Sequence, residues 1–417
     1  MSDKSRIAII VTVVVLTAML IVSITATVTL QIVANHMNLP VTADEGTDAD
    51  YDTRYSRLNE VYDRLMNEYY KELDEHTLIQ GAIDGMMSSV GDPYTFYYTP
   101  EEMTRTNNDR IGQYVGIGIQ VTCNEEGQIV IIRVFAGGPS REAGLLSGDI
   151  ILSADGVELQ AFTSDELTEA VSHIKGEQGT YVSLIIKRGD ELIETRVLRD
   201  NVISERVYYC MLDDDIGYIQ LTEFFGAAVT EMKNAVENLQ ESGAGGIIFD
   251  LRGNGGGQLD ICLDILDIFL SDSLVVYTED RAGEKQFYYS DNESNDIPLA
   301  VLIDSNSASA SEITASALSE NDRAKLFGST SYGKGIVQSL YVFPGDGAGM
   351  QLTTSAYYTP KGNSIHQVGI SPDFTVESGE VVFSLAGESG TYEEDPVVMA
   401  AYDYLINNIQ YDEEAEN

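Results

Sequence analysis

The sequence predicts an α+β protein of several domains behind an N-terminal membrane-spanning helix. Three observations lead to this prediction: an uncharged apolar stretch near the N-terminus, a run of short β-rich segments in the middle, and strands alternating with helices in the second half. With 417 residues the chain is long enough for two to four domains. Hydrophobic residues make up 43% of it, which is ordinary for a globular protein.

The charge and the few cysteines and histidines exclude several classes of function. A net charge of -43, from 67 acidic and 24 basic residues, disfavours nucleic-acid binding because phosphates would be repelled. Three cysteines without a CxxC spacing give no disulfide framework. The four histidines are scattered along the chain. We therefore expect neither a metal site nor a cofactor.

Residues 7–30 carry no charge and would span about 36 Å as a helix, enough to cross a bilayer. Lys4 and Arg6 precede this stretch, and an acidic segment follows it. The positive-inside rule then predicts a cytoplasmic tail at 1–6 and a single-pass cell-membrane protein with its remainder outside the cytoplasm. A cleaved signal peptide is the alternative, but the apolar run is long for one.

The rest of the chain is expected to contain a linker and four further parts. A polar, acidic linker at 31–54 leads to a helical region at 55–104, where apolar residues recur at three- and four-residue spacing. The apolar faces of these helices either pack on the rest of the chain or form a dimer arm. The following parts are a β-rich domain at 105–200, an α/β domain at 201–392, and a C-terminal helix with an acidic tail at 393–417.

The β-rich domain is interrupted by one predicted helix, Ser164–Ile174, with Thr163 and Glu166 as its capping box. In the α/β domain, the apolar strands Ile247–Phe249 and Leu299–Ile303 are each followed by a loop and a helix. Such units favour parallel strands in one sheet, with their loops at the same edge. We therefore expect the glycine-rich loop after the first strand to lie near Ser309, which follows the second.

Ser309 is a candidate nucleophile because it lies at a predicted helix N-terminus, where backbone amides and the helix dipole stabilise an oxyanion. The alternative is a capping box with Glu312. Two bases are possible. Lys334 is flanked by glycines and needs burial to lower its pKa, and Gln338, four residues on, shares its face and could orient the amine. His366 is the other candidate, in a turn-rich stretch.

The glycine-rich loop at 250–257 matches no nucleotide-binding motif. It lacks the GK[ST] of a phosphate loop, and Gln258 takes the place of the last glycine of a dinucleotide fingerprint. Its exposed amides could form half of an oxyanion hole, or the segment is a tight strand-to-helix turn.

Together these motifs resemble the carboxyl-terminal processing (tail-specific) proteases, which are PDZ-containing Ser/Lys peptidases. The family's D-L-R-x-N-x-G-G loop is matched at Asp250–Gly257, its S-A-S-A-S-E segment at Ser307–Glu312, and its G-K-G-x-V-Q segment at Gly333–Gln338. Serine and lysine stand 25 residues apart, as in the family pattern. Gly255 is a departure, because many members have proline there.

The resemblance implies an α/β protease core of the ClpP/crotonase-like type at 201–392. It implies Ser309 as nucleophile, Lys334 as base and Gln338 as its aligner. The Ala310 amide and one from Gly255 or Gly256 would then form the oxyanion hole. It also implies a homodimer, because family members pair.

The β-rich domain is similar to bacterial PDZ domains, through Gly137–Ser140, Ala143–Leu145 and Gly148–Ile151. In that resemblance a carboxylate-binding loop is formed by Tyr114, Val115, Gly116, Ile117 and Gly118. Lys175 either pairs with the bound tail or is a favourable charge at a helix C-terminus. The PDZ domain is expected to regulate the catalytic cleft as well as to dock substrates.

The resulting expectation is a membrane-anchored serine endopeptidase that cleaves proteins near their C-termini after PDZ recognition of the free tail. Its partners would be protein or peptide substrates with free C-termini, the membrane and a second copy of the chain. Two alternatives remain: a non-catalytic PDZ adaptor on a dead protease-like fold, and an esterase or other acyl hydrolase that uses Ser309 with His366.

Overall fold

The computed structural model describes residues 48–124, 126–135, 137–213, 215–291, 293–379, 382–385 and 391–415. The predicted cytoplasmic tail, the predicted membrane span at 7–30 and most of the predicted linker lie outside the described residues. Within the described ranges, no helix combines the length and the apolarity needed to cross a bilayer. The chain divides into two compact units, one up to Ala82 and one from Ile83 onward.

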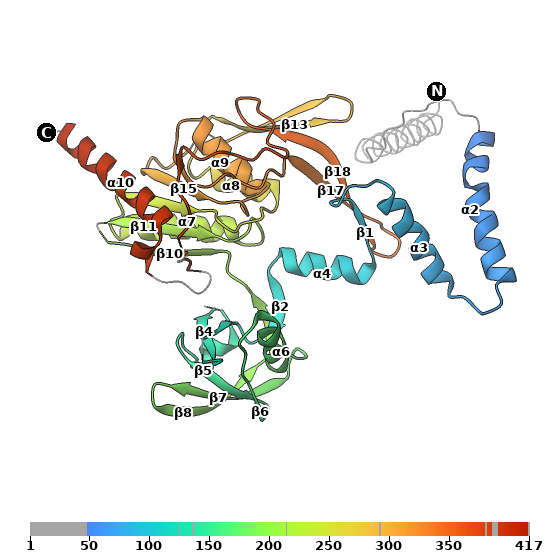
Figure 1. The fold of residues 1–417 in the computed structure, drawn as a ribbon, viewed down its shortest axis with the longest axis horizontal. Coiled ribbons are helices and arrows are strands. Elements are labelled where there is room, and N and C mark those ends of the chain that lie inside the picture. The colour runs from blue at the N-terminus through green and yellow to red at the C-terminus, as the bar shows by residue number, and fades with distance from the viewer. Residues whose placement is uncertain are drawn as a thin grey trace, which may run out of the picture. The chain divides into compact units, whose positions relative to one another are not determined.

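The first unit contains α2 (Asp48–Glu68) and the start of α3 (Glu75–Ser88) (Figure 1). The predicted apolar stripe does lie on a helix, and its side chains at Leu58 and Val61 are 45% and 50% exposed. The Tyr62 hydroxyl donates to Glu75 Oε1 at 2.5 Å and ties the end of α2 to the start of α3. The stripe therefore has little cover from the other described residues of its own unit.

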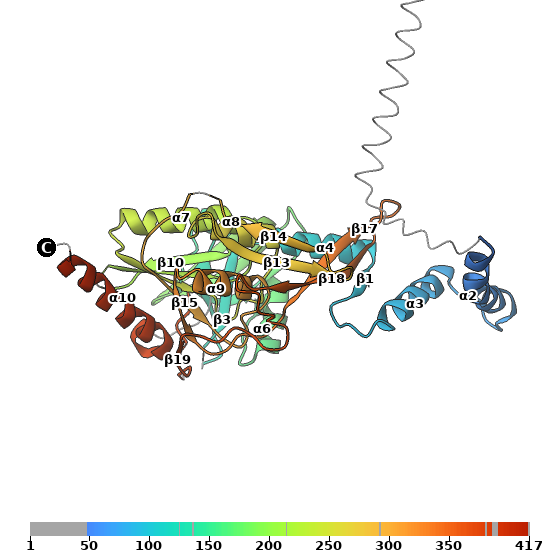
Figure 2. The same cartoon turned by 90° about the horizontal axis from the view of Figure 1, so that it is seen from above.

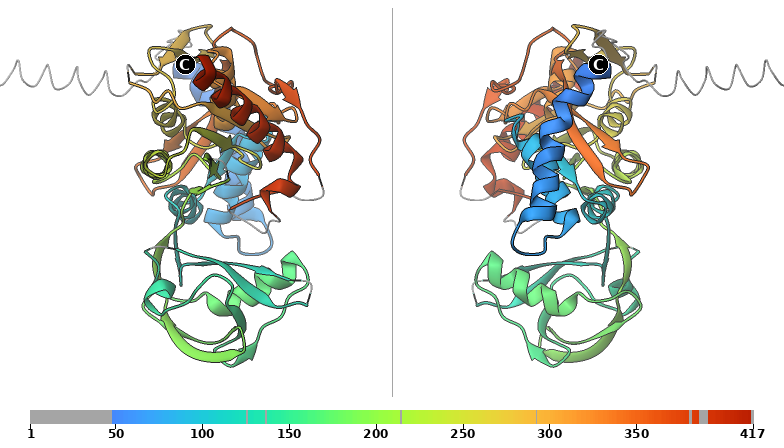
Figure 3. Two further views of the ribbon diagram at one scale, coloured as in Figure 1. Left: turned by 90° about the vertical axis from the view of Figure 1, so that its left-hand side faces the viewer. Right: turned by 90° about the vertical axis from the view of Figure 1, so that its right-hand side faces the viewer.

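The β-rich domain of the second unit is built on an antiparallel sheet in the order β3-β4-β5-β7-β8, with β6 paired to β5. Figure 3 shows this domain as a separate block of strands and helix. The strands of the sheet are β3 (Ile119–Cys123), β4 (Ile129–Val134), β5 (Ile150–Ala154), β6 (Val157–Glu158), β7 (Tyr181–Arg188) and β8 (Glu191–Leu198). A separate pair, β2 (Gln113–Gly116) and β9 (Asp200–Ile203), lies where the chain enters and leaves.

Two helices accompany these strands, α5 (Pro139–Glu142) and α6 (Ser164–Ile174). The bounds of α6 are those predicted, and its cap is confirmed because the Thr163 side chain accepts a hydrogen bond from the Glu166 amide at 3.3 Å. The core between the sheet and the helices is aliphatic, with Ile131, Ile151 and Leu184 fully buried.

The α/β domain is built on a six-stranded sheet in the order β10-β11-β12-β15-β16-β19. All neighbouring pairs are parallel except β10 with β11, which confirms the predicted parallel arrangement. The strands are β10 (Val207–Met211), β11 (Ile216–Leu221), β12 (Gly246–Asp250), β15 (Leu299–Ile303), β16 (Lys325–Gly328) and β19 (Phe374–Thr375).

Helices cover both faces of this sheet. One face packs on α7 (Ala228–Glu241), α8 (Leu259–Leu266) and α9 (Ala310–Glu320), and the other packs on α10 (Pro396–Ala415), which follows the 3-10 turn Tyr392–Glu394. Figure 2 shows α7 and α8 above the sheet and α10 below it. The alternation of strand side chains explains the division, since Phe249 faces α8 whereas its neighbour Ile248 faces α10.

A second, antiparallel sheet completes the site. Its central strand β18 (Gly349–Tyr358) pairs with β17 (Ile336–Val342) along one edge and with β1 (Phe96–Tyr98) and β13 (Leu274–Asp280) along the other. Strand β14 (Lys285–Tyr289) extends it beyond β13, and α4 (Pro100–Arg110) follows β1. The sheet brings the loop before β17, which carries Lys334, close to the N-terminus of α9.

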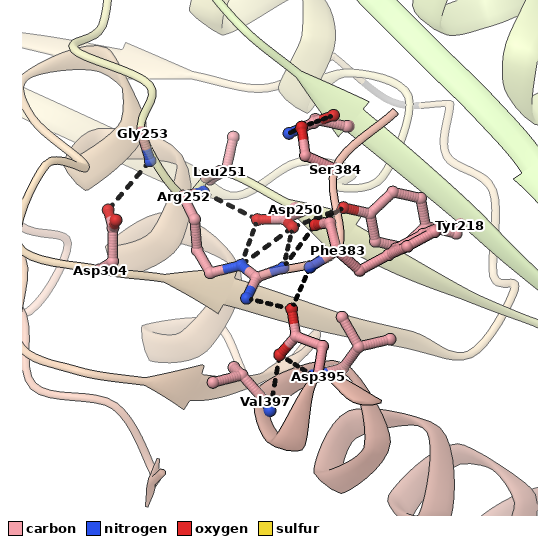
Figure 4. A network of polar contacts seen from close by, with 12 residues as sticks. Tyr218, Asp250, Leu251, Arg252, Gly253, Asp304, Phe383, Ser384, Asp395 and Val397 are labelled. Carbon is pink, nitrogen blue, oxygen red and sulfur yellow. Dashed lines mark hydrogen bonds and ion pairs between the residues drawn. The ribbon is translucent and has the colours of Figure 1, made fainter. Parts of the chain in front are cut away.

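A buried ionic network fixes α10 to the end of β12 (Figure 4). Arg252 bonds Asp250 Oδ2 at 2.6 Å through Nη2 and Asp395 Oδ2 at 2.8 Å through Nη1. The Tyr218 hydroxyl donates to Asp250 Oδ2 at 2.6 Å, and the Val397 amide at the start of α10 donates to Asp395 Oδ1 at 2.9 Å. All four titratable side chains are buried, so each depends on its partners.

We expect Arg252→Met to lower the free energy of unfolding by about 3–5 kcal/mol, because it leaves two carboxylates buried without their cation. Urea unfolding of the variant measures this. The matched control is Lys285→Met, which removes a surface ion pair to Glu279 of 3.5 Å and should cost less than about 1 kcal/mol. Equal losses in the two variants would contradict the prediction.

Candidate active site

Ser309 lies between β15 and α9 in a backbone conformation that is rare for a side-chain-bearing residue, with φ 56° and ψ −114°. Neighbouring contacts hold it there. The Ser309 amide donates to Glu312 Oε2 at 2.9 Å, and Ser307 Oγ donates to the Leu251 carbonyl at 2.8 Å. Positive φ at the start of a buried helix is strain that the surrounding bonds must maintain, and such strain is typical of functional sites.

The glycine-rich loop is bonded directly to the Ser309 segment, as the parallel strands predicted. The Asn254 carbonyl accepts from the Ala308 amide at 3.0 Å and from Ser311 Oγ at 2.8 Å. At Gly256, φ is 103°, and a Cβ there would lie 2.7 Å from the Ala308 carbonyl oxygen and 2.8 Å from Ser309 Cβ. Only glycine lets the two loops approach this closely.

The predicted oxyanion donors differ in their availability. The Gly256 amide donates to Asn254 Oδ1 at 2.8 Å, so it is already engaged within its own loop. The amides of Ala310 and Gly255 have no hydrogen bond to any described residue, and both residues line the cavity that Ser309 faces. Between the two alternatives for the loop donor, the geometry therefore favours Gly255.

Glu312 joins the Ser309 and Lys334 segments, a role beyond the helix cap considered from the sequence. This fully buried carboxylate accepts four hydrogen bonds, three of them from backbone amides. Oε2 accepts from Ser309 N at 2.9 Å and Lys334 N at 2.8 Å, and Oε1 accepts from Ser331 Oγ at 2.6 Å and Gly333 N at 2.7 Å. The S-A-S-A-S-E spacing predicted that Glu312 caps the helix. No local pattern in the sequence indicated that it also accepts hydrogen bonds from residues some 20 positions downstream.

Tyr357 of β18 makes a second bridge between the same segments. Its buried hydroxyl lies 3.2 Å from the Ser309 carbonyl oxygen and also contacts the carbonyl of Lys334. The amides of both segments are thus held by Glu312 and their carbonyls by Tyr357.

Lys334 is partly buried, and this burial lowers the pKa of its amine, as predicted, whereas the nearby charges of Asp92 and Glu312 act in the opposite direction. The Nζ atom lies 4.6 Å from the centre of the Tyr94 ring. Among the described residues, no hydrogen bond joins Nζ to Ser309 Oγ. The structure thus brings a lysine of lowered pKa to the site, with its amine directed at an aromatic face.

One cavity of about 490 Å³ contains the candidate residues. Its walls come from the glycine-rich loop, the start of α9 and strand β17, and they include Ser309, Ala310, Gly255, Lys334 and Gln338. Both sheets contribute, which explains why residues distant in sequence meet here.

Gln338 lines the cavity without contacting Lys334 in the described residues. Its amide donates weakly to Thr353 Oγ1 at 3.3 Å and to the Ile336 carbonyl at 3.4 Å. A four-residue spacing predicted a shared face, but Lys334 precedes β17 and the β17–β18 register shifts between Val337 and Gln338. The loop and this irregularity remove the simple periodicity on which the prediction relied.

His366 is absent from the lining of the cavity. Its backbone lies against Gly335, and its Nδ1 atom is buried without a hydrogen-bond partner in the described structure. The structure therefore gives no support to a Ser309–His366 pair.

The β-rich domain has a small groove of about 40 Å³ between β3 and α6. Four of the five predicted loop residues line it, Tyr114, Gly116, Ile117 and Gly118, and Lys175 lies at its other side with Ile174. Val115 is not part of the lining. The Ile117 and Gly118 amides have no backbone acceptor among the described residues, so they are available to a ligand. Burial raises the pKa of Tyr114, whose ring packs on Gly116, to about 12.

Three family models match the sequence. They are described as peptidase family S41, at residues 215–376, the PDZ domain, at 115–198, and the activating protease CtpB N-terminal domain, at 19–102. The first two coincide with the α/β domain and the β-rich domain of the structure.

Two curated relatives are similar over most of the chain. The carboxyl-terminal-processing protease of Synechocystis is 37% identical, over 79% of this chain and 77% of its own. The carboxy-terminal processing protease CtpA of Bacillus subtilis is 33% identical, over 78% of this chain and 70% of its own. A solved Bacteroides fragilis structure named for the S41 proteases shares the fold, with a TM-score of 0.52 at 17% identity over 76% of this chain and 90% of that one.

We expect Glu312→Gln to reduce peptide turnover about a hundredfold, because an amide NH₂ must face two donors and the Ser309 and Lys334 segments then shift apart. Turnover and urea unfolding, measured together, check this. The matched control is Glu320→Gln on the same helix, where the carboxylate accepts only from Lys361 and Asn363. A Glu312→Gln enzyme with unchanged turnover would show that the bridge is dispensable.

Proposed function

The chain belongs to peptidase family S41 and is a carboxyl-terminal processing serine protease with a PDZ domain; on this premise we propose that it works through a Ser309–Lys334 acyl-enzyme mechanism on proteins recognised by their free C-terminal tails. The observation that carries the proposal is that Ser309 and the partly buried Lys334 line one cavity while Glu312 bonds both of their backbones. This arrangement supports the proposal because the fold holds the two backbone segments together, with both side chains at the same cavity.

In the proposed mechanism the neutral Lys334 amine accepts the proton of Ser309 Oγ while Oγ attacks the scissile carbonyl carbon. The resulting oxyanion receives hydrogen bonds from the Ala310 and Gly255 amides. Collapse of the tetrahedral intermediate expels the amine product, which takes the proton from the Lys334 ammonium. Water then attacks the acyl-enzyme by the same route. Gln338, on the wall of the same cavity, would orient the amine once it leaves its present position.

Strand β17 offers the substrate an extended docking edge. Its inner neighbour is β18, and its other edge has no partner strand among the described residues. Ile336, Val337 and Leu340 of this strand line the cavity. A peptide added along this edge would bind largely through main-chain hydrogen bonds, which suits a protease that accepts varied sequences.

The PDZ groove would supply the preference for chain ends. The Ile117 and Gly118 amides can hold a terminal carboxylate, and Lys175 beside the groove adds a positive charge. Occupation of this groove by a tail would also regulate the cleft.

Membrane anchoring through residues 7–30, a catalytic region outside the cytoplasm and homodimerisation are further parts of the proposal. The uncharged N-terminal stretch supports the first two, and the uncovered apolar stripe of α2 supports the third. Release of the full chain from membranes by alkaline carbonate would exclude an anchor. Sedimentation of residues 40–417 as a monomer at micromolar concentration would exclude the dimer.

We expect Ser309→Ala to abolish turnover and Lys334→Ala to reduce it about 10²–10⁴-fold without unfolding the protein. Since burial lowers the pKa of Lys334, wild-type turnover should rise with pH through a midpoint below the ordinary lysine value of about 10.4. Peptide cleavage from pH 5 to 10 measures both. His366→Ala is the control and should retain turnover. If His366→Ala were inactive while Lys334→Ala stayed active, the base would be His366 rather than Lys334.

A peptide with a free C-terminus should be cut several times faster than the same peptide amidated, because amidation removes the charge that the PDZ amides and Lys175 would bind. Lys175→Gln should reduce this ratio toward one. Initial rates below saturation measure it, with Lys187→Gln, on the far strand β7, as the matched control. Identical rates for the two peptides would mean that the domain does not read carboxylates.

A further inference from the structure

The turn at residues 91–95, between α3 and β1, reaches the catalytic lysine although it lies more than 200 residues earlier in the sequence. Asp92 organises the turn, since its carboxylate accepts from the Tyr94 amide at 3.0 Å and from Thr95 Oγ1 at 2.7 Å. The Thr353 amide of β18 donates to Thr95 Oγ1 at 3.1 Å and fixes the turn on the second sheet. Tyr94 is thereby held in a defined place beside the loop of Lys334.

The ring of Tyr94 presents its face to the lysine amine. Nζ of Lys334 lies 4.6 Å from the ring centre, within the range in which an aromatic face attracts an ammonium ion. The hydroxyl of Tyr94 lies near that of Tyr332, two residues before Lys334, and this neighbour raises the pKa of Tyr94. The turn therefore holds the backbone of Tyr94, and its ring faces the lysine amine.

The same turn is linked through Thr353 of β18 to Gln338, the other residue expected to act with Ser309. The Thr353 hydroxyl accepts a hydrogen bond from the Gln338 side-chain amide at 3.3 Å, and the Thr353 backbone amide donates to the Thr95 hydroxyl. Lys334 and Gln338 are thus both oriented toward the turn and its neighbour rather than toward each other.

We propose that Tyr94 is a positioning residue for Lys334, whose ring face holds the protonated amine away from Ser309 until the amine loses its proton. The proposal rests on Lys334 being the base. An ammonium is attracted by the ring quadrupole, whereas a neutral amine is not. Transfer of the proton to solvent therefore removes the attraction and frees the amine to accept the proton of Ser309 Oγ. The protonation state of the lysine would then set both its basicity and its location.

The surrounding charges fit this arrangement. The anions of Asp92 and Glu312 favour the protonated form, and burial disfavours it. The cavity wall adds Arg110, Glu223 and Asp260, and Tyr332 and Tyr357 border the lysine loop. Since the ring adds to the pull of the two anions, its removal should make the lysine easier to deprotonate.

The test measures the titration of the Lys334 amine directly, by trace acetylation from pH 6 to 11 and mass spectrometry, in the full chain carrying Ser309→Ala. Tyr94→Leu keeps an apolar side chain without a quadrupole and should lower the midpoint by about half a unit to one unit. Tyr94→Phe keeps the ring face and should keep the midpoint. The same shift should appear in the acid limb of turnover when Ser309 is restored.

Tyr97→Leu is the control for general loosening, because Tyr97 lies three residues further on, stacks on Phe343 and does not line the cavity. It should leave the midpoint unchanged. A midpoint that stays or rises in Tyr94→Leu, or that falls equally in Tyr94→Phe, overturns the proposal. Acetylation reads the amine whether or not it is the base, so a failure of Lys334 as base, seen as turnover in Lys334→Ala, remains distinguishable.

Discussion

The site depends on one buried carboxylate, that of Glu312. A charge with no exposure to water is tolerated only when its oxygens are fully hydrogen-bonded, and here four donors meet that need. Because those donors belong to the Ser309 and Lys334 segments, the hydrogen bonds that satisfy the carboxylate also bring these two segments together. The strained backbone at Ser309 is then a consequence of this packing, maintained by bonds that the buried charge cannot give up.

The two ends of the loop after β12 have different structural roles. Asp250 and Arg252 point into the core and fasten α10 to the sheet, whereas Asn254 and Gly256 hold the Ser309 segment. The motif at 250–257, interpreted from the sequence as one catalytic signature, therefore has a structural role in its first half. This division makes physical sense, because a loop that must present an amide within tenths of an ångström needs a rigid base. It also means that loss of activity alone, after a change in this motif, would not identify a catalytic residue.

Local patterns predicted those features that local physics determines. The apolar runs Ile247–Phe249 and Leu299–Ile303 predicted the parallel strands, and the capping box predicted the bounds of α6. The strand-to-loop transitions predicted that the glycine-rich loop lies beside Ser309. The second sheet was not predicted, since β18 pairs with β13 across 75 to 81 residues and with β1 across 251 to 255, and no local signal specifies such pairs. The orienting role of Gln338 stays a prediction, because its amide bonds Thr353 and Ile336 in the structure and an irregularity in β17 interrupts the periodicity from which a shared face was inferred. Tyr94 was not singled out from the sequence, because no local pattern relates it to Lys334, 240 residues later.

Two opposing effects act on the pKa of Lys334, and the positions of the neighbouring groups determine their balance. The proposed role of Lys334 as a base at neutral pH requires a lowered pKa, yet the nearby carboxylates of Glu312 and Asp92 raise the pKa of its amine. Burial has the larger effect on the pKa of Lys334. The opposing effect of Glu312 is limited in part by its hydrogen-bond donors, because each bonded N–H or O–H dipole has its positive end on the carboxylate and offsets some of its field. Asp92 is likewise engaged by Tyr94 N and Thr95 Oγ1. Both anions near the amine are thus committed to backbone or hydroxyl donors rather than to an ion pair with Lys334, which would have fixed the proton on the base.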